Sequence, residues 1–108
     1  MVKKALRLLS TVLICVGLLS SLAHASSVKG KVFYTKFLKQ PCGFTGEVMG
    51  KKYTTAEWRS FYNENKLSFV IKTLCPKAPD IVDEKDLTNL YHFFSSFASD
   101  SGNVPSCN

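Results

Sequence analysis

The chain has 108 residues, with 14 Lys and Arg against 8 Asp and Glu, and a net charge of +6. This length suits one domain, and the basic residues do not gather into the clustered footprint of a nucleic-acid-binding protein. No serine, histidine and aspartate spacing suggests a hydrolase, and the acidic cluster lacks the ligand spacing of a calcium loop, so we expect neither an enzyme nor a metal site.

The N-terminal segment has the layout of a secretory signal peptide. Three basic residues among the first seven precede an apolar stretch at residues 8–22, and Ala23-His24-Ala25 has the small-x-small pattern of a cleavage site. We therefore expect cleavage before Ser26. The 15 residues of the apolar stretch fall short of the roughly 20 that span a bilayer as a helix.

The predicted organisation is a signal peptide at residues 1–25 and one domain at residues 26–108. The mature domain would carry 11 basic and 8 acidic residues, a net charge of 11 − 8 = +3. Such a mild excess favours docking to an acidic partner or to anionic lipid. We expect a periplasmic or secreted protein with no transmembrane segment after processing.

Three cysteines remain in the predicted mature chain, at Cys42, Cys75 and Cys107. An exported protein pairs the cysteines it can, so we expect one disulfide, and the sequence leaves all three pairings open. The third thiol would be free, bonded to another molecule or attached to a cofactor. Redox-active pairs are usually spaced Cys-x-x-Cys, which is absent here, so a structural disulfide is the favoured interpretation.

The periodicity of apolar residues predicts a first helix at residues 28–39, ended by Gln40-Pro41. A tight loop with two glycines is expected at residues 41–46. The apolar residues of the first helix fall on one side, which we expect to be buried, with lysines on the other. These apolar residues are Val28, Val32, Phe33, Phe37 and Leu38.

A second helix is expected to begin at Thr54 or Thr55, where Thr-Thr-Ala-Glu fits a capping box, and to run toward Asn65. Residues 67–74 form an apolar run that we interpret as a short helix halted by Cys75-Pro76, followed by a connector at residues 77–82. No partner strand is visible.

The last helix is the best specified, at residues 86–98, with Asp83 as its N-cap. Turn-forming residues at 99–103 end it, and Pro105 prevents its resumption. The spacing of its apolar residues predicts a buried face made of Leu87, Leu90, Tyr91, Phe94, Phe97 and Ala98. The fold class predicted is all-α, with three to four helices.

This order of elements resembles that of small class I cytochromes c. The resemblance covers most of residues 28–98 and rests on Gly30-Lys31-Val32-Phe33-Tyr34, a Cys-Gly loop, Thr-x-x-Glu-Trp and a terminal Asp-Leu-x-x-Leu-Tyr-x-Phe helix. In that family the first and last helices cross. The resemblance implies that Gly30 and Tyr34 pack at the crossing.

The haem-attachment motif of the family, Cys-x-x-Cys-His, is absent. If Cys42 is aligned with the first cysteine of the motif, Thr45 takes the place of the second cysteine and Gly46 that of the histidine. If Cys42 is aligned with the second cysteine, Gly43 takes the place of the histidine. The candidate haem residues are therefore Cys42, Met49 and His92. Met49 follows the loop closely, whereas the distal methionine of the family comes near the run into the last helix, and His92 lies off the apolar stripe.

Three functions follow as hypotheses. The preferred one is a non-enzymatic, cytochrome c-like accessory or partner in respiratory electron transfer, within a periplasmic redox assembly and without covalently attached haem. The second is a haem-binding electron carrier that uses one thioether at Cys42 or binds haem non-covalently among its aromatic residues. The third is a disulfide-stapled interaction protein or thiol-redox protein unrelated to haem.

Overall fold

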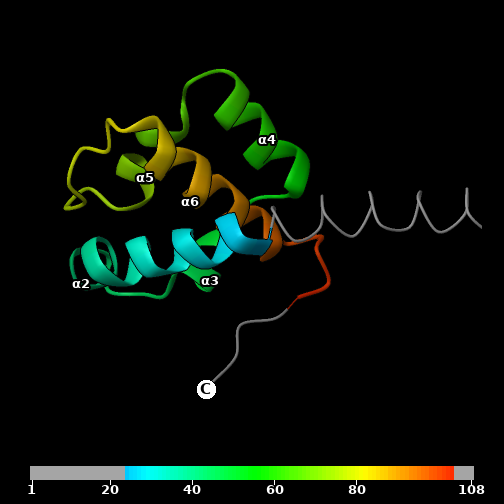
Figure 1. Ribbon diagram of the computed structural model, residues 1–108, viewed down its shortest axis with the longest axis horizontal. Coiled ribbons are helices and arrows are strands. Elements are labelled where there is room, and N and C mark those ends of the chain that lie inside the picture. Colours follow the sequence, from blue (N-terminus) through cyan, green and yellow to red (C-terminus); the bar gives the residue numbers. More distant parts are fainter. Residues whose placement is uncertain (1–23, 104–108) are drawn as a thin grey trace, which may run out of the picture.

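A computed structural model describes residues 24–103 of the chain (Figure 1). A helix occupies residues 24–37 of this part and is followed by five more. These are α2 (Lys39–Cys42), α3 (Gly46–Gly50), α4 (Thr55–Asn63), α5 (Leu67–Leu74) and α6 (Glu84–Ser96). The described part contains no strand, which confirms the all-α class, whereas the predicted number of three to four helices is too low.

The predicted signal peptide lies outside the described residues, except for residues 24 and 25. Within residues 24–103, no helix has both the length and the apolar character needed to cross a bilayer.

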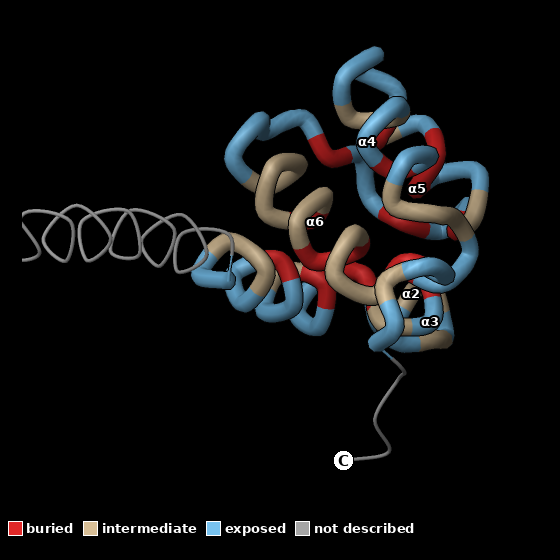
Figure 2. Tube along the Cα trace, turned by 90° about the vertical axis from the view of Figure 1, so that its right-hand side faces the viewer, coloured by how far each residue is buried: buried red, intermediate tan, exposed pale blue. Residues whose placement is uncertain are grey.

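Helix α6 lies at the centre of the domain and packs against α3, α4 and α5. The carboxylate of Asp83 accepts a hydrogen bond from the Lys85 amide, so Asp83 is the N-cap as predicted. The helix begins at Glu84, two residues before the predicted start. Buried segments gather where the helices face one another, and the outer turns are exposed (Figure 2).

The 24–37 helix packs against α6 at Gly30. A Cβ atom built on Gly30 would clash with the backbone carbonyl of Asn89 and lie 2.8 Å from the Cβ atom of Phe93. Tyr34, one turn later, meets the rings of Phe93 and Phe94 edge-on at centroid distances of 6.2 and 6.0 Å. Gly30 and Tyr34 therefore lie where these two helices meet.

The predicted buried face of the 24–37 helix is wrong for three residues. Val28, Val32 and Phe37 are 49%, 58% and 50% exposed. The inward face instead carries Gly30, Tyr34 and Leu38, which follow one another at a spacing of four residues. The hydrophobic pattern missed this face because glycine has no side chain to count, although its small size is what lets the helices approach closely.

The prediction that Gln40-Pro41 ends the first helix is also wrong. The helical path breaks at Leu38, and α2 then continues through Pro41 to Cys42. Pro41 is the third residue of α2 and lies in its first turn. Backbone N–H groups there have no acceptor within the helix, so the missing N–H of proline costs no helical hydrogen bond. Gly43, with φ of 80°, ends α2 in the left-handed conformation that glycine adopts readily.

The predicted loop at residues 41–46 is only three residues long, because α3 begins at Gly46. The Thr45 hydroxyl caps α3 by accepting from the Val48 amide. The glycines at its two ends, Gly46 and Gly50, let it lie close to α6, since a Cβ on Gly46 would strike the ring of Phe93. Phe93, missed in the predicted face of α6, fills the space that Gly30 and Gly46 leave open.

The middle of the chain follows the prediction closely. Thr54 and Glu57 form the expected capping box at the start of α4. Helix α5 spans Leu67–Leu74 and ends before Cys75, as expected. Asn65, with φ of 57°, makes the turn between α4 and α5.

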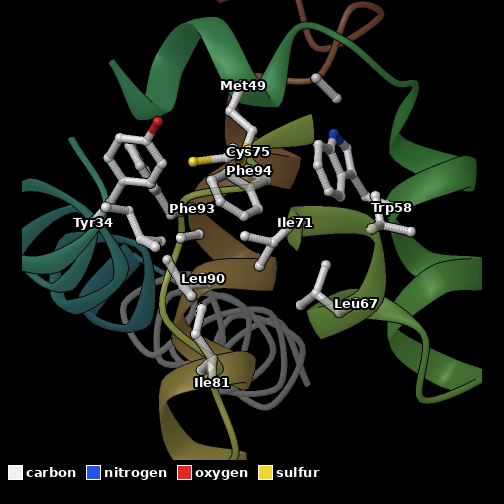
Figure 3. Packing of buried hydrophobic residues seen from close by; sticks show 14 residues of the cluster. Tyr34, Met49, Trp58, Leu67, Ile71, Cys75, Ile81, Leu90, Phe93 and Phe94 are labelled. Carbon is white, nitrogen blue, oxygen red and sulfur yellow. The ribbon is translucent and has the colours of Figure 1, made fainter. Parts of the chain in front are cut away.

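Four buried aromatic side chains, those of Tyr34, Trp58, Phe93 and Phe94, pack among the aliphatic residues of the core (Figure 3). Trp58 has no exposed surface, stacks on Phe94 at a centroid distance of 4.8 Å, and donates from its indole nitrogen to the carbonyl oxygen of Gly50 at 2.8 Å. Tyr53 and Phe61 meet Trp58 edge-on. These contacts join α3, α4 and α6 around one indole ring.

Candidate functional site

Cys42 and Cys75 form a disulfide, with 5.2 Å between their Cα atoms. Cys42 is the last residue of α2 and Cys75 the C-cap of α5, so the bond joins two segments that lie 33 residues apart. The single disulfide expected from the sequence is present among the described residues, and the structure selects one of the three pairings that the sequence left open. Cys107 lies outside the described residues.

The two sulfurs differ in their surroundings. Cys75 is 2% exposed and belongs to the core, whereas Cys42 is partly buried at its edge. Met49, with no exposed surface, belongs to the same core cluster, and its side chain points into the packed interior (Figure 3). Two candidate haem residues, Cys42 and Met49, are thus brought to one part of the molecule.

His92, the third candidate, lies elsewhere. It is half-buried on α6, next to Tyr91, with a ring centroid distance of 5.1 Å, and is not a member of the core cluster. Tyr91 in turn stacks on Tyr62 of α4 at 4.5 Å with nearly parallel rings. The structure therefore does not bring His92 together with Cys42 and Met49.

The residues that the resemblance points to do not fit a haem in this arrangement. The Cys42 sulfur is already bonded to Cys75, so forming a thioether would first require reduction of the disulfide. Met49 is enclosed by packed side chains, and Trp58 and Phe94 fill the interior beside it. No histidine accompanies these residues as an axial ligand.

Tyr34 is a buried polar residue in this region, but it has a structural partner. Its hydroxyl donates to the carbonyl oxygen of Phe44 at 2.8 Å. Burial, and secondarily the negative charge of Glu47, raises the pKa of the Tyr34 phenol well above its ordinary value. The phenol stays protonated at neutral pH and fastens the 24–37 helix to the loop before α3.

The charges are distributed unevenly along the described part of the chain. Residues 24–52 hold six lysines and one glutamate, a net charge of 6 − 1 = +5, whereas residues 53–103 hold five basic and seven acidic residues, 5 − 7 = −2. The lone glutamate, Glu47, pairs with Lys31 at 3.2 Å. The half containing the 24–37 helix, α2 and α3 is therefore strongly basic, and the half containing α4 to α6 is weakly acidic.

Within residues 24–103, no group of three or more His, Cys, Asp or Glu side chains is placed to hold a metal ion. The features that remain are the disulfide and the basic surface around it. Sequence reasoning placed lysines on one side of the first helix but missed Thr35, Phe44 and Thr45, which line hollows beside Lys31 and Lys39. A repeat of Lys31, Thr35 and Lys39 at a spacing of four residues is the sequence signal that marks this surface.

The fold and the site together define a disulfide-linked, all-α domain with a basic half. No protein family, curated protein or solved structure matches this chain.

Proposed function

We propose that this protein is a small exported, cytochrome c-like accessory of a periplasmic redox assembly, and that it works by docking to an acidic partner and carries no haem. The observation that supports this most directly is the Cys42–Cys75 disulfide. Cys42, at the end of α2, is the position that the resemblance aligns with haem attachment. Cys75 lies just before the connector into α6, the part of the chain where that family carries its distal methionine.

In this proposal, the disulfide takes over the structural task of the haem. A cofactor held between the attachment loop and the distal segment would link them, and here a covalent bond links them directly. Below about 80 residues a single hydrophobic core is marginal without such a staple. The tight contact of Gly30 with α6 further supports the likeness to the family, since the resemblance expects these helices to cross there.

Lysines on the basic half give the proposed protein a means of finding its partner. These lysines are Lys29, Lys36, Lys39, Lys51 and Lys52, all exposed. None of them takes part in an ion pair within residues 24–103. Unpaired exposed lysines on one side of a molecule increase the rate of association with an acidic surface, and the effect weakens with added salt.

The proposal is tested by an absorption spectrum. The protein is exported from a host that attaches haem to cytochromes c, and oxidised and reduced spectra are recorded for the purified chain. We expect no Soret band and no reduced α band. Haem at one equivalent per molecule would reject the proposal and support the haem-carrier alternative. Spectra of Cys42→Ala and His92→Ala would then identify the attachment residue.

Gel electrophoresis without reductant distinguishes the proposal from the thiol-redox alternative. We expect the disulfide to remain closed and not to exchange with a partner. On a non-reducing gel of periplasmic extract, the protein should therefore migrate as a single species. On such a gel, a larger species that disappears in Cys42→Ser or in Cys107→Ser but persists in an Arg59→Ala control would indicate a mixed disulfide and support the thiol-redox function instead.

A further inference from the structure

Thr35 lies at the centre of a hollowed part of the basic half. Three hollows, with volumes of about 180, 450 and 470 Å³, all have Thr35 in their lining. We call the surface formed by these three neighbouring hollows the Thr35 groove. Two of the hollows are lined by the 24–37 helix, α2 and the loop before α3, and the third lies along the 24–37 helix alone.

The groove has basic edges and apolar walls. Lys31 and Lys39 lie one helical turn before and after Thr35, and Lys36 lines the hollow beside Val32. Phe44 lines a different one of the three hollows, together with Thr35 and Lys39. Val32 and Phe44 thus offer apolar surface, and the lysines surround it with positive charge.

The one acidic residue in the lining is Glu47, and Lys31 neutralises it at 3.2 Å. Lys36 and Lys39 take part in no ion pair of the described residues. A ligand with carboxylates would therefore meet two free ammonium groups and no opposing charge. Lys36 and Lys39 are exposed, so salt screens their attraction to a carboxylate.

From these observations we infer that the Thr35 groove binds an acidic segment of a partner protein, with an apolar side chain seated in the hollow beside Val32 and carboxylates on Lys36 and Lys39. The hollows favour a protein segment over a membrane, because a flat lipid surface fills no depression, whereas a protruding side chain does. This inference rests on the proposed docking function and identifies the surface that performs it.

The test uses fluorescence anisotropy of a labelled peptide, acetyl-EEDLEEDLEE-amide, with the purified, disulfide-intact protein at low ionic strength. We expect saturable binding that weakens with salt. The double variant Lys36→Glu/Lys39→Glu should weaken binding by about tenfold or more, since two attractive charges become repulsive. The control Arg59→Glu/Lys85→Glu makes the same change of net charge on α4 and α6, at exposed residues that line none of the three hollows, and should have a much smaller effect.

A second pair of variants tests the shape of the groove separately from its charge. Thr35→Trp should fill the hollows and weaken peptide binding with every lysine in place. Thr73→Trp, at another exposed helical threonine on α5, should leave binding unchanged. Far-UV circular dichroism confirms that both variants are folded.

Three outcomes would overturn the inference: equal loss of binding in both double variants, no effect of Thr35→Trp, or binding to phosphatidylglycerol vesicles without binding to the peptide. Self-association through the acidic residues of a second copy, detected by sedimentation and abolished by Lys36→Glu/Lys39→Glu, would also replace the proposed occupant. The haem spectrum is measured independently, so loss of the groove function and loss of the haem-free proposal are distinguishable.

Discussion

Gly30 shows how one missing side chain sets the distance between two helices. The Asn89 carbonyl and the Phe93 side chain occupy the space in which a Cβ atom would lie. No other residue fits without moving the 24–37 helix away from α6. The close contact seats Tyr34 against Phe93 and Phe94, so the aromatic packing of the crossing depends on this glycine.

We expect Gly30→Ala to lower the free energy of unfolding by about 2 kcal/mol or more, because one methyl group must be forced into a filled contact. Urea unfolding followed by Trp58 fluorescence measures this change. Gly102→Ala is the control: Gly102 has φ of 82° but nothing within 4 Å of its Cβ position, so only backbone strain of about 1 kcal/mol is expected. An equal or smaller effect at Gly30 would contradict the close-contact interpretation.

Tyr34 should make the fold sensitive to alkali. Its pKa is raised in the folded state, so the unfolded chain loses the phenolic proton first, near pH 10. The stabilisation contributed by the protonated Tyr34 phenol is complete below that pH. It is lost as the pH rises toward the pKa of the phenol in the folded state. We expect Tyr34→Phe to cost about 1 kcal/mol at neutral pH, through the lost hydrogen bond to Phe44.

Tyr34→Phe should also lose less stability than the wild type as the pH rises above about 10. Thermal unfolding across this pH range, compared with Tyr62→Phe, provides the measurement. The Tyr62 hydroxyl also has a hydrogen-bond partner, Thr88, but its phenol is only partly buried. An unchanged alkaline decline in Tyr34→Phe would show that another group is responsible.

At the scale of elements, the disulfide holds α2 against the end of α5. Helix α2 has four residues and no side-chain cap, so it is too short to be stable alone. Cys42 fixes its last turn to Cys75, which is part of the core. The disulfide therefore attaches the short, uncapped helix α2 to the core at Cys75.

Replacing both Cys42 and Cys75 by serine should lower the free energy of unfolding by about 3 to 4 kcal/mol, the chain-entropy value for a loop of 33 residues. Denaturation of the variant and of the dithiothreitol-reduced protein, each compared with Cys107→Ser, measures the effect. If the double variant matched the control, the disulfide would not be a staple, and the reason to regard it as a substitute for haem would fail.

A second link between distant elements joins the start of α4 to the segment after α6. The Asp100 carboxylate accepts from both the backbone amide and the hydroxyl of Thr55, each at 2.8 Å. The bond from the Thr55 backbone amide, followed by that from its hydroxyl, holds the pKa of Asp100 below its usual range. These bonds place the C-terminal segment over the first turn of α4.

Because the folded pKa is lowered, the contribution of Asp100 is present above its unfolded pKa of about 3.9 and is lost as the pH falls through the folded value. We expect Asp100→Asn to be less stable than wild type at neutral pH and to approach it at acid pH, where the wild-type carboxyl is protonated. Urea midpoints at the two pH values test this, with Asp80→Asn as control. A constant difference at all pH values would exclude a role for the charge.

At the scale of the whole molecule, one core unites the described helices. The 24–37 helix and α3 to α6 all supply buried residues to a single cluster that surrounds Trp58 and Phe94. We expect two-state unfolding, in which far-UV circular dichroism and Trp58 fluorescence give one midpoint. Two separate transitions would show that the basic half and the acidic half fold independently, which the shared core does not allow.

The sequence by itself determined the elements whose signals are local. The Thr54–Glu57 capping box, the Asp83 cap and the stop at Cys75-Pro76 each depend on residues within one turn of chain, and the structure has all three boundaries where those residues place them. The periodic apolar face of α6 likewise predicted Leu90, Phe94 and Ala98 as core residues.

Only the tertiary structure decided what depends on distant neighbours. The pairing of Cys42 with Cys75 depends on which cysteines the fold brings together, and the inward face of the 24–37 helix depends on Gly30 meeting Asn89. The Thr35 groove likewise requires the loop before α3 to lie beside the helix. A pattern along one segment cannot indicate these features, because each arises from the contact of two segments that are separate in the chain.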